Sequence, residues 1–173
     1  FGELAMSGCG AYAKVEGFAF LPITSFTSAI TTFVGQNLGA EEFDRAKKGA
    51  RFGILCSLLI AEGIGVITHV FSPVFIGAFC DSQEAIAFGV DKARICALFF
   101  CLLAFSHAVA SVCRGAGKAF VPMTIMLVFW CVVRIAYITT VMHFIHDIQY
   151  IYWAYPITWS LSSIVYFLYY HFS

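Results

Sequence analysis

Charged side chains are scarce in this 173-residue sequence. Lys, Arg, Asp and Glu make up 12% of it, against about 25% in a typical soluble domain. Ten basic and ten acidic residues are too few to cover the core of a soluble domain of this length with polar surface. Hydrophobic residues make up 61%, and the mean hydropathy is +0.86. The composition therefore argues against a soluble enzyme and predicts a polytopic membrane protein.

Motifs for catalysis and metal binding are also missing. The sequence has seven cysteines but no CxxC pair, and it contains no HExxH motif, Ser-His-Asp arrangement or phosphate-binding glycine loop. His69 and His107 are not spaced as metal ligands. The formal net charge is zero and no basic stripe is present, which argues against a nucleic-acid partner. We therefore expect no enzyme activity, no metal site and no cofactor.

Long apolar runs fill most of the sequence. A membrane-spanning helix needs about 20 mostly apolar residues, and five segments meet this requirement. They cover approximately residues 11–39, 52–79, 86–113, 120–145 and 149–171. The connections between them are short and contain no domain boundary. We therefore predict one all-α transmembrane bundle of five spanning helices over residues 1–173.

The distribution of Lys and Arg predicts the orientation of this bundle. Six lie in the predicted connections after the first and third spans, namely Arg45, Lys47, Lys48, Arg51, Arg114 and Lys118. Three lie near the other ends of the spans, namely Lys14, Lys92 and Arg94. Connections rich in Lys and Arg stay in the cytoplasm. We therefore expect a cytoplasmic C-terminus, and an odd number of spans predicts a further helix upstream.

The first predicted span has a polar half and an apolar half when its residues are placed at about 100° intervals. The polar half contains Thr24, Thr27, Ser28, Thr31, Thr32, Gly35 and Gln36, and the apolar half contains Ile23, Phe26, Ala29, Ile30, Phe33 and Val34. We expect the polar half to face protein and the apolar half to face lipid. The polar half either packs against another helix with its hydroxyls bonded to its own backbone, or lines a water-filled cavity. Pro22 removes a backbone hydrogen bond and is expected to kink the helix.

Charged residues within the spans are candidates for function. A charge at membrane depth costs about 2.5–3.5 kcal/mol, so Glu62 and Arg134 are expected to face the bundle interior or to be paired. Arg134 has either a structural or a transport role, and Glu62 has either a structural role or exchanges a proton during transport. Lys14 and Glu16 lie at the outer start of the first span, where anchoring at the membrane interface is expected.

Several short motifs resemble the multidrug and toxic compound extrusion (MATE) family. The first stretch shares with that family Lys14 with Glu16, Pro22, the run GQNLGA at 35–40 that includes Asn37, and Asp44-Arg45 with Lys48. The run RGAGK at 114–118 with Pro122-Met123 is similar to the turn before the family's eleventh helix, and Arg134-Ile135 and Pro156-Ile157 with Trp159 are also similar. By this resemblance the five spans are the eighth to twelfth of twelve helices.

The resemblance implies a fold of two six-helix lobes around a cavity that opens alternately to each side of the membrane. It implies export of drugs, organic cations and other amphipathic compounds across the plasma membrane, driven by inward H⁺ or Na⁺. The implied partners are the N-terminal lobe of the same polypeptide, the lipid and the exported compound. One branch of the family carries an acidic coupling residue where this sequence has Leu103, so the ion site is expected outside this chain.

These considerations select the candidate site residues. Candidates for the substrate or ion pathway are Thr24, Ser28, Thr31, Gln36, Glu62 and Arg134, and candidates for structural or gating roles are Lys14, Glu16, Pro22, Asn37 and Arg114. Two other functions remain open. One is a flippase of the same superfamily that moves a lipid-linked saccharide, although a pyrophosphate usually needs a strongly cationic cavity and only Arg134 lies deep. The other is a membrane scaffold that does not transport, in which the polar half of the first span is packed dry.

Overall fold

The computed structural model describes residues 2–172, which form helices joined by short turns and contain no strand. The elements are α1 (Gly2–Gly39), α2 (Phe43–Gly77), α3 (Gln83–Ala97), α4 (Phe100–Gly115), α5 (Phe120–Met126), the π-helical segment η1 (Leu127–Val133), α6 (Arg134–Phe144) and α7 (Ile148–Phe172). The segments α5, η1 and α6 follow one another without a break and form one rod. The all-α fold predicted from the sequence is confirmed.

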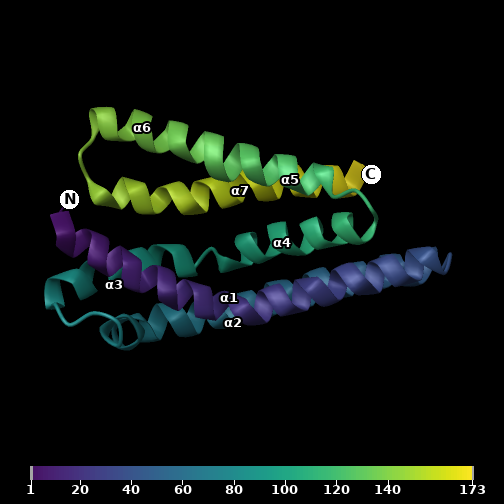
Figure 1. Cartoon of the computed structure of the whole chain (residues 1–173), viewed down its shortest axis with the longest axis horizontal. Coiled ribbons are helices and arrows are strands. Elements are labelled where there is room, and N and C mark those ends of the chain that lie inside the picture. Colours follow the sequence, from purple (N-terminus) through teal and green to yellow (C-terminus); the bar gives the residue numbers. More distant parts are fainter. Residues whose placement is uncertain (1, 173) are drawn as a thin grey trace.

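The helices are arranged in three layers. Figure 1 shows α1 and α2 side by side, α3 and α4 in the middle, and α7 with the rod of α5 and α6 on the opposite side. Helix α1 packs on α2, α3 and α4, and α7 packs on α3, α4 and the rod. The middle layer therefore brings side chains of α1 and α7 towards the same region of α3.

Three stretches are long and apolar enough to cross a membrane by length and composition. These are Gly2–Gly39, Phe43–Gly77 and Phe120–Phe144, and the bent pair of α3 and α4 makes a fourth. The sequence predicts a fifth span over 149–171. Helix α7 has 25 residues, which at 1.5 Å per residue is long enough for the hydrocarbon core of about 30 Å. It is not among the qualifying helices, because its many tyrosine, tryptophan and serine side chains lower its hydropathy.

The region predicted as one helix over 86–113 is two helices in the structure. Helices α3 and α4 meet at an angle of 57°, and no proline or glycine marks the break between Ala97 and Phe100. The cause lies in the packing on α2. A Cβ atom on Gly65 of α2 would lie only 2.5 Å from the backbone oxygen of Ala97, so the two backbones touch where α3 ends. The bend comes from this tertiary contact and has no local sequence signal.

A buried hydroxyl network connects the middle layer to α7. The hydroxyl of Ser106 lies 3.2 Å from that of Ser162 and 3.0 Å from that of Ser163. Ser163 also donates to the backbone oxygen of Leu102, and the indole N–H of Trp130 donates to Ser162. Hydrogen bonds between helices are a main source of cohesion inside a membrane. This network therefore fixes α7 against α4 and the rod.

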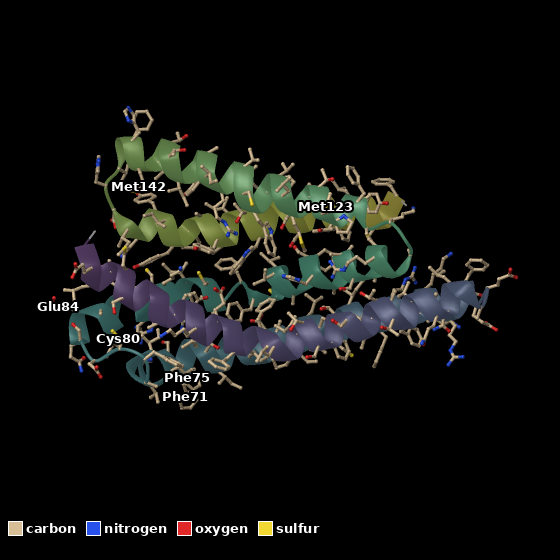
Figure 2. All side chains as sticks on the ribbon, in the orientation of Figure 1. Phe71, Phe75, Cys80, Glu84, Met123 and Met142 are labelled. Atoms are coloured by element: carbon tan, nitrogen blue, oxygen red, sulfur yellow. The ribbon has the colours of Figure 1, made fainter. Side chains whose placement is uncertain are left out.

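The outer surface of the bundle carries large apolar side chains. Figure 2 shows Phe71 and Phe75 projecting from the outer side of α2, and their rings are 6.2 Å apart. Met123 of α5 is likewise exposed. Contiguous apolar surface of this kind is costly in water and suited to the hydrocarbon of a bilayer.

Candidate functional site

Charged and aromatic side chains from four elements meet between the layers. Helix α1 supplies Tyr12 and Glu16, α3 supplies Lys92, α6 supplies Arg134, and α7 supplies Tyr155. We call these five residues the charged cluster. Only Glu16 and Arg134 are candidates from the sequence, and the structure brings them into one site.

The part of the cluster on α1 is a tyrosine–carboxylate pair. Tyr12 is fully buried, and its hydroxyl donates a hydrogen bond of 3.3 Å to the Oε1 atom of Glu16, one helical turn further along. The positive charges of Lys92 and Arg134 both act on this carboxyl group. The sequence predicts that Glu16 anchors the helix at the membrane interface, but the contacts of Glu16 in the structure are inside the bundle.

Lys92 reaches the cluster from α3, and the sequence does not identify it as a site residue. Its side chain is 7% exposed, and its Nζ atom lies 5.2 Å from the ring centre of Tyr12 and 4.5 Å from that of Tyr155. Such cation–π contacts contribute about 2 kcal/mol or more when they are desolvated. A signal is present in the sequence, because Gly89, which has no side chain, and Cys96, which has a small one, lie on the same face of α3 as Lys92 and let another helix approach there.

Close backbone contact between α1 and α3 brings Lys92 to Tyr12. A Cβ atom on Gly89 would lie 2.7 Å from the backbone oxygen of Gly8. The two helices can therefore approach only because both positions lack a side chain. One turn further along each helix, this approach leaves the ring of Tyr12 within reach of Lys92.

Arg134 is held by a hydroxyl group on α7. Its Nε and Nη2 atoms donate hydrogen bonds of 3.2 and 2.8 Å to the Oγ1 atom of Thr158, and its Cζ atom lies 4.4 Å from the ring centre of Tyr155. Thr158 is fully buried and donates its own proton to the backbone oxygen of Ala154. The π-helical segment ends directly before Arg134. The guanidinium is therefore stabilised by a hydroxyl group and an aromatic ring, which offsets part of the cost of a charge at membrane depth.

The polar half of α1 lies along a different face. Thr24 and Ser28 are exposed in this chain and donate hydrogen bonds to the backbone oxygens of Leu21 and Thr24. Thr31 is half-buried, and its Oγ1 atom donates to the backbone oxygen of Ser111 on α4 at 3.2 Å. The hydroxyls are thus bonded to backbone, while two of the three side chains face outward from the described bundle.

The expectation that the apolar half of α1 faces lipid is wrong for three of its residues. Ile23, Ile30 and Val34 are at most 5% exposed. The reason is that this side of α1 is covered by neighbouring helices. Ile30, for example, packs directly over Gly53 of α2, where a Cβ atom would lie 2.8 Å from it.

The candidates at the far end of α1 lie near the turns. Gln36 is exposed, and Asn37 is buried, with its Nδ2 atom donating to the backbone oxygen of Phe33 at 2.7 Å. Arg114, at the end of α4, donates to the hydroxyl of Ser111 at 2.8 Å. None of these three side chains belongs to the charged cluster.

The remaining candidates are spread over the surface. Glu62 is exposed on α2 instead of facing the interior, and its neighbour is the thiol of Cys101. Lys14 is exposed, with its Nζ atom 5.5 Å from the ring centre of Phe79.

Pro22 lies within the continuous helix α1, and Figure 1 shows that helix bent near its middle. Between residues 2 and 172, no three His, Cys, Asp or Glu side chains are grouped to hold a metal ion.

Comparison with known proteins gives a consistent result. The family model described as MatE matches residues 1–140. The chain is 25% identical to the probable multidrug resistance protein YoeA of Bacillus subtilis, over 99% of this chain and 37% of that protein. It is 29% identical to the probable multidrug resistance protein NorM of Thermotoga maritima, over 72% of this chain and 28% of that protein. The chain thus spans about a third of the length of these relatives.

Solved structures show the same fold. The chain is similar to a mutant of the Vibrio cholerae MATE transporter VcmN, with a TM-score of 0.87 and 19% identity, over 97% of this chain and 38% of that one. It is also similar to MATE family transporters described as outward-facing, with a TM-score of 0.87 and 14% identity, and as inward-facing, with a TM-score of 0.81 and 15% identity. These two likenesses cover 95% and 91% of this chain, and 37% of each transporter.

Proposed function

Because the chain belongs to the MATE family, a family of multi-pass membrane proteins, we propose that it forms most of the C-terminal lobe of a secondary active transporter. This transporter exports drugs and organic cations by alternating access and is driven by an inward flow of H⁺ or Na⁺. It acts as a transporter and not as an enzyme. Its partner within the same polypeptide is the N-terminal lobe, and its surroundings are the lipids of the plasma membrane.

One observation carries this proposal. The fold of this chain resembles the corresponding part of a transporter described as inward-facing and of one described as outward-facing. A lobe that keeps its fold in both states can move as a rigid body, which is how alternating access works in transporters with repeated lobes. The hydroxyl network between α4 and α7 and the bonds of Arg134 to Thr158 supply the internal cohesion that such a movement needs.

The coupling ion binds outside this lobe in our proposal. The only carboxyl group in the charged cluster is that of Glu16, and two cations act on it. A third positive charge at that place would be repelled by Lys92 and Arg134. Leu103, at the position where one branch of the family carries an acidic residue, is not ionisable and is buried. Six Lys and Arg residues lie in the first turns of α2, in the last turn of α4 and just after α4. Because Lys and Arg are enriched on the cytoplasmic side, they support a cytoplasmic location for these helix ends and for the C-terminus.

The test is dye export by the full-length protein in bacterial cells that lack their own exporters. Cells loaded with the cationic dye ethidium are given an inward gradient of either Na⁺ or H⁺, and the loss of fluorescence is followed. We expect faster export with one of the two gradients, and no acceleration once an ionophore for that ion is added. An export rate that is the same with and without either gradient contradicts ion coupling. The absence of export in every condition contradicts the transport function.

A further inference from the structure

A pocket lies at one end of the bundle, away from the charged cluster. Figure 1 shows that the turn between α1 and α2, the turn between α4 and α5, and the end of α7 lie at the same end of the molecule. Side chains near these three places enclose a pocket of about 340 Å³, which is within the usual range of about 300–1,000 Å³ for ligand sites. Its floor consists of small or apolar buried side chains, namely Val34, Ala46, Ala50 and Cys113.

The charged side chains that line this pocket are basic. Lys47 and Arg51, one turn apart on α2, and Lys118, just after α4, line it, and no Asp or Glu of the described chain does so. We call it the basic pocket. The acidic residues Glu42 and Asp44 line a separate hollow at another side of α2. Lys47 and Arg51 form no ion pair or hydrogen bond with another described residue, so their charges are available to an anionic ligand.

Two tyrosines place the basic pocket at the level of the lipid headgroups. Tyr169 and Tyr170, in the last turn of α7, are half-buried and form part of its wall. The Nζ atom of Lys118 lies 5.9 Å from the ring centre of Tyr169. Tyrosine is enriched where a membrane-spanning segment meets the headgroups, because its ring is apolar and its hydroxyl is polar. The basic pocket therefore faces the boundary between lipid and water.

A second hollow lies beside the basic pocket on the same three helices. Helices α2 and α7 both pack on α4, and between them is a groove of about 510 Å³ that is lined mainly by apolar side chains, among them Leu58, Phe105, Ile164 and Phe167. We call it the apolar groove. Leu58 lies about two helical turns beyond Arg51 of the basic pocket, which is about 10 Å further into the membrane. The basic pocket and the apolar groove are thus spaced like the headgroup and an acyl chain of one lipid.

We propose that the basic pocket and the apolar groove together bind an anionic phospholipid. Its phosphate lies against Lys47 and Arg51, and one acyl chain lies in the apolar groove. Basic pockets between membrane helices on the cytoplasmic side bind the headgroups of anionic lipids, and our proposed function places this end of the bundle in the cytoplasm. The positive charge favours an anionic headgroup over a zwitterionic one. The apolar groove favours a lipid over a free phosphate ion.

The experiment measures lipid binding to the purified full-length protein in micelles of an uncharged detergent, by native mass spectrometry. The two probes are phosphatidylglycerol and phosphatidylcholine, each with two oleoyl chains. The wild type is compared with a double variant, Lys47→Gln with Arg51→Gln. The control is Arg45→Gln with Lys48→Gln, which removes the same charge from the same part of α2, because Arg45 and Lys48 line the hollow that contains Glu42 and Asp44.

We expect the wild type to bind phosphatidylglycerol more tightly than phosphatidylcholine. The double variant Lys47→Gln with Arg51→Gln should weaken the binding of phosphatidylglycerol about tenfold or more, because each basic residue near an anionic lipid contributes to its binding. Its binding of phosphatidylcholine and its thermal unfolding temperature should not change. The control should bind phosphatidylglycerol as tightly as the wild type does.

Three results would overturn the inference. Equal binding of the two lipids by the wild type would mean that the basic pocket does not select an anionic headgroup or is filled by another part of the polypeptide. An equal loss of affinity in both double variants would mean that the net charge of α2, and not the pocket, attracts the lipid. Displacement of phosphatidylglycerol by an equal concentration of inorganic phosphate would mean that the site binds a free anion. The first and third measurements use the wild type, so they do not depend on the folding of a variant.

Discussion

The bond between Arg134 and Thr158 gives the most direct test of how the lobe is held together. Replacing Thr158 by Val keeps the size of the side chain and removes the oxygen that accepts both hydrogen bonds, at 3.2 and 2.8 Å. Replacing Arg134 by Met removes the donors and the charge. A double-mutant cycle with both substitutions isolates the interaction between the two side chains.

The size of the effect follows from the environment. Hydrogen bonds between helices inside a membrane contribute about 0.6 kcal/mol on average and up to about 1.7 kcal/mol. Bonds from an ionised donor are roughly twice as strong as neutral ones. Thr158 is fully buried, so water cannot replace the lost acceptor. We therefore expect a coupling free energy of about 1–2 kcal/mol between Arg134 and Thr158.

The assay is reversible unfolding of the purified full-length protein in detergent micelles, followed by circular dichroism as a denaturing detergent is added. The control is Thr139→Val. Thr139 is exposed on α6, and its hydroxyl donates only to the backbone of its own helix. This substitution should show no coupling to Arg134→Met. A coupling energy for Thr158 below about 0.5 kcal/mol, the usual error of additivity, would refute the role assigned to this bond.

Three further substitutions test other parts of the account in the full-length protein. Gly89→Val should greatly reduce the amount of folded protein, because a Cβ atom there meets the backbone oxygen of Gly8. The control Gly17→Val, at a site with open space, should leave the amount of folded protein unchanged. Equal yields of the two variants would contradict the close approach of α1 and α3. Ser57→Ala should leave the free energy of unfolding unchanged or raise it by up to about 1 kcal/mol, because the Ser57 hydroxyl is buried and has no hydrogen-bond partner; a clear loss of stability would contradict this. Glu62→Gln should leave ethidium export and its pH dependence unchanged, because Glu62 is exposed on α2 and lies outside the charged cluster; weaker export or a shifted pH profile would contradict this.

The sequence predicts the helical membrane fold because that information is local. Runs of apolar residues and the spacing of short connections depend only on neighbouring positions. The break between α3 and α4 depends instead on where Gly65 of α2 meets the backbone of Ala97. The residue types near the break do not indicate that contact. The buried positions Ile23 and Ile30 are misassigned for a related reason. An apolar side chain suits lipid and the bundle interior equally well, so its polarity does not reveal which of the two it faces.

The sequence identifies only two of the five residues of the charged cluster, Glu16 and Arg134, for the same physical reason. Arg134 stands out because it is the one arginine within a long apolar run. Lys92 does not stand out, because it follows Asp91 near the start of a helix and looks like a residue of the membrane interface. Its place between Tyr12 and Tyr155 results from the contact of α1 with α3 and from the position of α7. Such convergence of four elements is a property of the tertiary structure.

The proposal of alternating access is tested most directly at the polar half of α1. Ser28 is replaced by Cys in a full-length background without other cysteines, and Ile30→Cys serves as the buried control. Labelling by a membrane-impermeant maleimide is measured from outside the cell, with and without the ion gradient that drives export. We expect Ser28→Cys to react at a rate that changes with the gradient, while Ile30→Cys stays protected. Protection of Ser28→Cys under both conditions would mean that this face meets lipid or dry protein, and would contradict the transport pathway.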